Sequence, residues 1–110
     1  MKRRVVITGI GTVNPLGNNV ADTWNAVKAG KCGIAPITHF DTTDFKVKLA
    51  GEVKDFDAEA LLGAKEAKRM DPYTQYAMAA SLEAWADAGI DSENENAGRM
   101  GCIVSSRPLW

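Results

Sequence analysis

The sequence predicts an α/β fold, in which buried strands pack against helices. Residues 3–10 and 100–106 are short apolar segments of the kind that form buried strands, and residues 71–89 carry the start and stop signals of a long helix. The chain has 110 residues, so it is one domain at most.

The first expected strand covers residues 3–10. Val5, Val6 and Ile7 form a continuous β-branched run, which is typical of a strand covered on both faces and therefore of a parallel sheet. Residues 11–19 follow with several turn-forming residues and predict a loop.

A first helix is expected over residues 20–29. Asn18 or Asn19 can cap its N-terminus with a side-chain oxygen, and Gly30 can adopt the left-handed conformation that ends many helices. Residues 31–46, which come next, are irregular and rich in turn formers.

The next two elements are short. Residues 45–53 alternate apolar and polar side chains, which is the period of a half-exposed strand, and Gly51 marks an expected bend. A short helix or turn is expected over residues 57–63.

The long helix has the clearest boundaries. Asp71 can cap it, Pro72 occupies the first helical position, where its missing N–H costs nothing, and Gly89 closes it. Six alanines give it a smooth surface that can lie close against a sheet or another helix, so we expect it to be mostly buried. Residues 100–106 then form the second buried strand.

The charge of the chain is nearly balanced. Thirteen Lys and Arg residues and fourteen Asp and Glu residues give a net charge of −1, which argues against a general nucleic-acid or membrane-surface binder. No apolar run reaches the length of a membrane span, and the N-terminus lacks the features of a signal peptide. Cys32 and Cys102 lie far apart with no pairing framework, which favours a reduced, cytoplasmic setting.

The loop after the first strand looks like a phosphate-binding turn. Gly9 and Gly11 fit the first two glycines of a dinucleotide fingerprint, but Asn14 occupies the third position. Pro15 disfavours a helical conformation at Asn14, so no helix begins where a phosphate would sit. We expect a structural turn, and a nucleotide-binding oxidoreductase half-domain is the least favoured function.

Few residues are candidates for catalysis. Cys32 follows the C-terminal end of the first expected helix, where the dipole disfavours a thiolate, and Cys102 lies inside an expected apolar strand. His39 is the only histidine and is expected to cap a turn or lie on the surface. Glu83 and Asp87 share one helical face, which we expect to be solvated. We therefore expect no catalytic residue, no metal site and no cofactor in this chain.

The glycine-rich opening also fits a second pattern. It resembles the opening of the β-ketoacyl-acyl-carrier-protein synthases, most closely the type II elongating enzymes of bacterial fatty-acid synthesis, through the motif Thr8-Gly9-x-Gly11-x-x-x-Pro15-x-Gly17. Further segments match the family in order and spacing, namely residues 30–34, 37–45, 50–57, 65–81 and 84–90. Together the matches cover residues 3–106, which is nearly the whole chain.

This resemblance implies a partial thiolase-like fold, the first part of the family's N-terminal half, with an incomplete sheet. Residues 1–106 would form the N-terminal synthase segment, and residues 107–110 depart from the family as a short tail. The family is several times longer, and its nucleophilic cysteine and two histidines lie beyond residue 110. The chain is therefore expected to be inactive alone. Because its strand edges lack partners, a stable monomer is not expected, and self-association, domain swapping or pairing with another piece of the protein would supply the missing strands.

The resemblance also implies a reaction and a partner. The family condenses malonyl-carrier protein with acyl-carrier protein, with decarboxylation, and its intact members are homodimers. Lys65, Lys68 and Arg69 fall at the helical spacing i, i+3 and i+4. By composition they are an ordinary solvated face, but they match the basic residues with which the synthases receive the acidic helix of acyl carrier protein. A non-catalytic module that binds this carrier is the alternative function.

Overall fold

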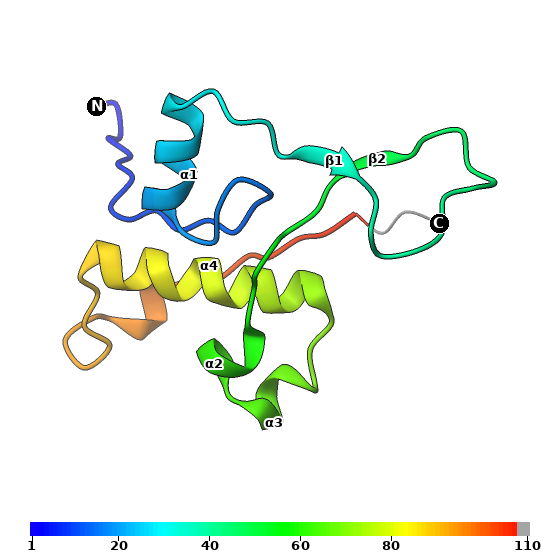
Figure 1. Ribbon diagram of the computed structural model, residues 1–110. Coiled ribbons are helices and arrows are strands. Elements are labelled where there is room, and N and C mark those ends of the chain that lie inside the picture. Colours follow the sequence, from blue (N-terminus) through cyan, green and yellow to red (C-terminus); the bar gives the residue numbers. More distant parts are fainter. Residues whose placement is uncertain (108–110) are drawn as a thin grey trace.

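A long central helix, α4, residues Pro72–Ala88, organises the molecule (Figure 1). The computed structural model describes residues 1–107, so residues 108–110 of the expected tail lie outside the described residues. The N-terminal segment and α1 lie on one side of α4, and α2 and α3 lie on the other. The other elements in chain order are α1 (Val20–Lys28), β1 (Ile34–Pro36), β2 (Leu49–Gly51), α2 (Ala58–Leu62), α3 (Ala64–Ala67) and a 3-10 helix (Ala97–Arg99).

The boundaries of α4 agree with the sequence prediction. Pro72 begins the helix, and Gly89 ends it in the left-handed conformation, with φ of +66°. Asp71 has the extended backbone of a cap, although its side chain makes no capping hydrogen bond. The expected burial is wrong, because Ala79 is the one buried residue of α4 and the Trp85 side chain is 42% exposed.

Helix α1 also follows its local signals. Asn19 caps the helix by accepting a hydrogen bond from the Asp22 N–H at 2.8 Å, and Gly30 follows it with φ of +69°. Asn18 instead donates from its side chain to the carbonyls of Lys54 and Asp55. Among the helices of residues 1–107, none has both the length and the apolar character that crossing a bilayer requires.

The loop before α1 is closed by a tight turn, as predicted. Asn14 and Gly17 exchange two backbone hydrogen bonds, of 2.9 and 3.1 Å. The Asn14 side-chain amide donates to the hydroxyls of Thr12 and Thr23, and its oxygen accepts from the Leu16 N–H. The third position of the apparent fingerprint is therefore occupied by a side chain that holds the turn together.

The two expected buried strands, 3–10 and 100–106, are wrong as local structure. Neither segment is a strand, and both expose their apolar side chains, with Val5 at 91% and Ile103 at 96%. A strand exists through hydrogen bonds to a neighbouring strand, and within residues 1–107 no segment supplies them. High β propensity alone therefore leaves these segments extended and unpaired.

The sheet of residues 1–107 is a small antiparallel pair. β1 and β2 pair Ile34 with Gly51 and Pro36 with Leu49. The half-exposed strand expected over 45–53 is thus shortened to three residues, and the region expected to be irregular contributes its partner. The α/β class holds in this reduced form.

Glycines allow the N-terminal segment to lie directly on α4. A Cβ atom at Gly9 would overlap the carbonyl oxygen of Ala84, and one at Gly11 would overlap that of Ala80. The alanines of α4 and the glycines of the loop therefore meet backbone to backbone. The sequence prediction of a smooth, closely packed α4 is confirmed on this face.

The chain has an extended shape and a large surface. Its radius of gyration is 17.1 Å, whereas about 13 Å is typical of a compact domain of this length. Its accessible surface is 9416 Å², against about 5,900 Å² for a compact protein of this mass. The buried apolar residues of the described chain are Ala26, Ala67 and Ala79. Most of its large apolar side chains are therefore available to a partner.

We predict that the chain self-associates through its unpaired apolar segments. Lysine in place of Val5 and Ile103 should shift the equilibrium toward the monomer, because it adds charge to two nearly fully exposed apolar sites. Sedimentation velocity at several concentrations measures the change, and Ser92→Lys, on an exposed polar turn, is the control. A single 11.8 kDa species of the unmodified chain at all concentrations would contradict the prediction.

Candidate functional site

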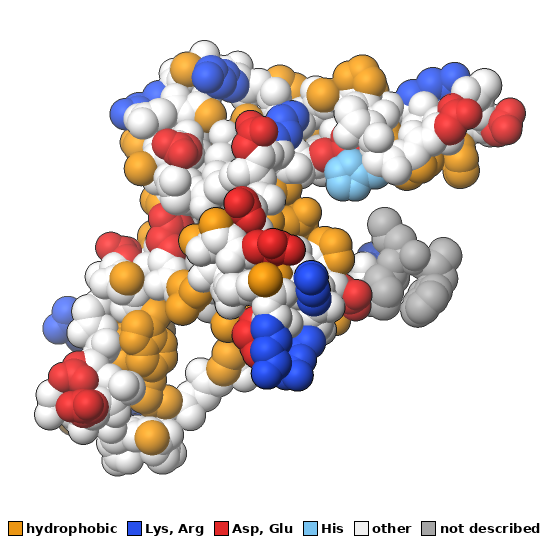
Figure 2. Space-filling view, turned by 60° about the horizontal axis from the view of Figure 1, so that its bottom comes forward, with side chains coloured by type: hydrophobic (Ala, Val, Ile, Leu, Met, Phe, Trp, Pro, Cys, Tyr) orange, Lys and Arg blue, Asp and Glu red, His pale blue; other side chains and the backbone are white. Residues whose placement is uncertain are grey.

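The three basic residues singled out in the sequence lie on one short turn. Lys65 is in α3, Lys68 ends that helix with helical backbone angles, and Arg69 follows directly. All three are exposed. Figure 2, in which the side of the molecule with α2 and α3 comes forward, shows Lys and Arg side chains gathered there. We call Lys65, Lys68 and Arg69 the basic surface.

Glu66 forms an ion pair with Arg69 of the basic surface. The Glu66 carboxylate approaches the Arg69 guanidinium, with 3.8 Å between Oε1 and Nη1. Both side chains are more than half exposed, so this pair contributes little to stability and is readily exchanged for another carboxylate. The arrangement is suited to binding an acidic partner through weak, reversible contacts.

Two contacts with α4 anchor the basic surface, a side-chain amide that bonds its backbone and an aromatic pair beside it. Gln75 donates from its side-chain amide to the carbonyl oxygens of Ala67, at 2.9 Å, and Met70, at 3.4 Å. Phe56, just before α2, packs edge to face on Tyr76 of α4, with ring centroids 5.1 Å apart. Neither anchor was predicted from the sequence, although an uncharged amide in the first turn of an alanine-rich helix was a signal for the Gln75 contact.

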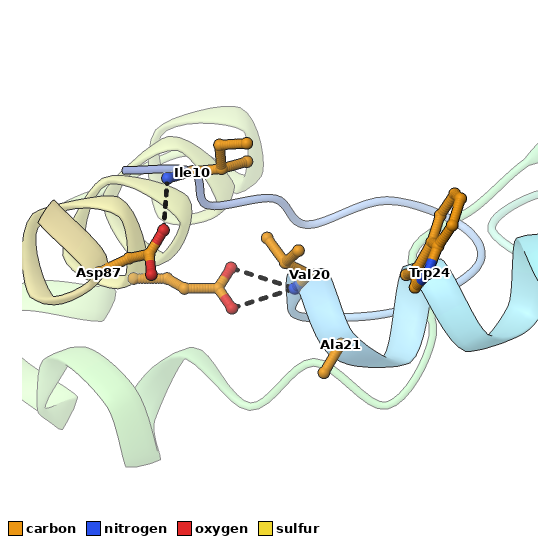
Figure 3. Close-up of a pocket in the computed structure, with 6 residues that line it drawn as sticks. Ile10, Val20, Ala21, Trp24 and Asp87 are labelled. Carbon is orange, nitrogen blue, oxygen red and sulfur yellow. Dashed lines mark hydrogen bonds between the residues drawn. The ribbon is translucent and has the colours of Figure 1, made fainter. Parts of the chain in front are cut away.

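A second group of charged residues corrects the sequence prediction. Glu83 accepts hydrogen bonds from the backbone N–H groups of Thr12 and Val20, both at 3.0 Å. Asp87 accepts one from the Ile10 N–H, also at 3.0 Å. Figure 3 shows the Asp87 carboxylate directed at Ile10 and two hydrogen bonds, made by Glu83, meeting at Val20 at the start of α1. The expectation of a solvated face is therefore wrong at Glu83, whose hydrogen bonds are part-buried, while Asp87 is exposed as expected although it also binds the N-terminal segment.

These carboxylates line a hollow of about 330 Å³ between α1 and α4, together with Ile10, Val20, Ala21 and Trp24 (Figure 3). Glu83 occupies the N-terminus of α1, where a phosphate would bind in a nucleotide-binding fold. A second anion at that point would be repelled by the carboxylate. The geometry therefore argues against nucleotide binding at the glycine loop.

We predict that Glu83→Ala lowers the free energy of unfolding by about 1–3 kcal/mol, because it leaves two part-buried N–H groups without an acceptor. Denaturant titration measures the loss, and faster hydrogen exchange at Thr12 and Val20 locates it. Glu93→Ala, which removes an exposed carboxylate of the turn after α4, is the control. Equal effects of the two substitutions would show that Glu83 does no more than contribute charge.

Neither cysteine is placed for nucleophilic chemistry. Cys32 lies in the exposed segment after α1, as predicted. Cys102 is also exposed, so its expected burial inside a strand is wrong, for the same reason that residues 100–106 form no strand. A reactive thiolate is usually held at a helix N-terminus or beside a cation, and each of these two follows the C-terminal side of a helix. In the described chain, no three His, Cys, Asp or Glu side chains form a set able to hold a metal ion.

His39 belongs to a polar cluster beside the two-stranded sheet. Its Nε2 lies 3.0 Å from Oε2 of Glu52, and the His39 side chain is 63% exposed, as the surface prediction required. Glu52 also accepts hydrogen bonds from the N–H and the hydroxyl of Thr38. Partial burial tends to raise the pKa of Glu52, but these hydrogen bonds and the charge of His39 outweigh it and lower the pKa. The cluster fastens the loop after β1 to the end of β2.

We predict that acid opens this cluster. The lowered pKa of Glu52 means that its carboxylate stabilises the folded loop at neutral pH, and this contribution is lost as the pH falls through the folded-state pKa. Hydrogen exchange at the Thr38 amide, followed from neutral pH down to about pH 3, measures the loss. Glu52→Gln removes the titration, so the same pH profile in that variant would contradict the assignment. The Thr43 amide reports separately on Asp41, whose pKa is lowered by hydrogen bonds from the Thr43 hydroxyl and N–H.

Comparisons with known proteins agree with the resemblance found in the sequence. The model of the family described as "Beta-ketoacyl synthase, N-terminal domain" matches residues 2–108. The chain is 47% identical over 105 residues to the 3-oxoacyl-acyl-carrier-protein synthase 2 of Coxiella burnetii, and 44% identical to that of Synechocystis sp.. Each match covers 96% of this chain and 25% of the relative, so the chain spans about a quarter of the length of these relatives.

A solved structure shows the same fold. The ishigamide ketosynthase/chain length factor superposes with a TM-score of 0.75 and 36% sequence identity, over 86% of this chain and 23% of the other. The predicted partial thiolase-like α/β fold is therefore confirmed. The boundary between residues 106 and 107 stays a prediction, as do the roles of Lys65, Lys68 and Arg69.

Proposed function

Because the chain belongs to the β-ketoacyl synthase family, we propose that it forms the N-terminal segment of a 3-oxoacyl-acyl-carrier-protein synthase of fatty-acid elongation. Such an enzyme is an acyltransferase that condenses malonyl-carrier protein with acyl-carrier protein and releases carbon dioxide. The observation that carries the proposal is the identity of 44–47% to synthases of this name over nearly the whole chain. In the intact enzyme we propose a cytoplasmic homodimer.

The residues of this segment serve docking and folding in this proposal, and the segment alone is inactive. Condensation requires a thiolate and neutral imidazoles directed at the developing negative charge. Cys32 and Cys102 lie in exposed irregular segments, and His39 is paired with Glu52. The nucleophile and the histidine pair are therefore assigned to parts of the synthase outside residues 1–107.

The part of the function assigned to this segment is recognition of acyl carrier protein by the basic surface. Three cations lie within five residues, and their charge is opposed nearby by the weakly held Glu66. Exposed charges of this kind accelerate and orient association and add modest affinity, which salt reduces. A carrier that delivers its acyl group and leaves requires such a contact. If the segment acts alone, it is the non-catalytic carrier-binding module considered above.

We predict that Lys65→Glu combined with Lys68→Glu weakens binding of acyl carrier protein about tenfold at low ionic strength, with a smaller effect as salt screens the charges. Calorimetric or NMR titration of the chain with holo acyl carrier protein measures the dissociation constant.

The matched control for this prediction is Lys46→Glu with Lys48→Glu, which makes the same charge change on the exposed segment before β2. It should alter binding little. If both double variants weaken binding equally, the change in net charge explains the effect, and the basic surface has no specific role. If Lys65→Glu/Lys68→Glu leaves binding unchanged, the proposed docking role is overturned.

A further inference from the structure

The backbone that carries the basic surface contains little more than one helical turn. Helix α3 has four residues, which is about one turn, and a helix of that length is unstable in isolation because its first turn is costly to form. Lys68 and Arg69 lie at and beyond its end. Backbone hydrogen bonds continue the turn to Met70, but so short a turn depends on contacts with a neighbour to stay formed.

Gln75 of α4 is the neighbour that makes polar contact with the turn. Its Nε2 donates to the carbonyl oxygen of Ala67 and to that of Met70, so one amide group bridges the two ends of segment 67–70. The Ala67 carbonyl also accepts a backbone hydrogen bond from the Met70 N–H at 3.3 Å, so Gln75 adds a contact from α4 to a turn that its own backbone already closes. Lys68 and Arg69 are the two residues enclosed between these contacts.

The anchor itself is firmly held. The Gln75 backbone N–H bonds to the Asp71 carbonyl at 3.0 Å, within the first turn of a 17-residue helix. The contacts are partly buried, and Ala67 is 4% exposed. Hydrogen bonds shielded from water in this way hold their geometry better than exposed ones.

We infer that Gln75 is a positioning residue of the carrier-protein docking surface, an inference that rests on the proposed function. Gln75 touches no partner. It fixes segment 67–70 before binding, so that Lys68 and Arg69 need not be ordered when an acidic helix arrives. Ordering a loop on association costs affinity. Because the Gln75 contacts already order segment 67–70 in the free chain, binding of the carrier need not pay this entropy.

The test replaces Gln75 by methionine, which keeps the length of the side chain and removes its donors. With the full chain and holo acyl carrier protein at low ionic strength, Gln75→Met should raise the dissociation constant about three- to tenfold. Thr74→Val, on the same turn of α4, is the control and should leave binding unchanged. Hydrogen exchange at Arg69 and Met70 should accelerate in Gln75→Met.

A second background separates positioning from general destabilisation. In a chain that already carries Lys68→Ala and Arg69→Ala, Gln75→Met should change the dissociation constant less than about twofold, because the side chains it positions are gone. An equal loss in both backgrounds, or accelerated exchange across α1 as well, would overturn the positioning role.

The outcomes distinguish this inference from the proposed function. If Lys65→Glu/Lys68→Glu binds the carrier as tightly as the unmodified chain, the docking surface is wrong and the inference fails with it. If that variant binds weakly while Gln75→Met binds normally, docking stands and the role of Gln75 is overturned.

Discussion

The fold of this segment depends on two carboxylates of one helix. Glu83 and Asp87 of α4 accept backbone N–H groups from Ile10, Thr12 and Val20, and so hold a segment that has no regular structure of its own. The hydrogen bonds of the Thr12 and Val20 N–H groups are part-buried, and backbone N–H groups that are removed from water require acceptors. Two acids one helical turn apart supply them along the length of the contact.

The same contact accounts for the glycines that resemble a phosphate-binding loop. Gly9 and Gly11 allow the chain to approach the carbonyl oxygens of α4 more closely than any side chain would permit. The loop therefore meets a helix flank with carboxylates beside it, where a phosphate loop would present free N–H groups to an anion. Glycines in a phosphate-binding loop let backbone N–H groups reach an anion, whereas here they let the loop pack against α4, whose own carboxylates accept those N–H groups.

Helix α4 also links the N-terminal segment to the proposed docking surface. Near its C-terminal end it binds the loop through Glu83 and Asp87, and in its first turn Gln75 and Tyr76 hold the turn after α3 and the start of α2. A rigid helix between them keeps the basic surface at a fixed place relative to the rest of the segment. This explains how a one-turn helix can present three cations in a defined arrangement.

The sequence by itself determined what depends on near neighbours: the ends of α1 and α4, which Asn19, Pro72 and Gly89 mark, and the spacing of the basic surface. Only the tertiary structure decided the rest. The strand prediction at Val5 and Ile103 failed because strands require partners from distant sequence. The role of Glu83 was hidden because its acceptor atoms act on N–H groups more than sixty residues away. Caps and helical spacing act over a few residues, whereas sheet pairing and long-range hydrogen bonds to carboxylates depend on chain segments that only folding brings together.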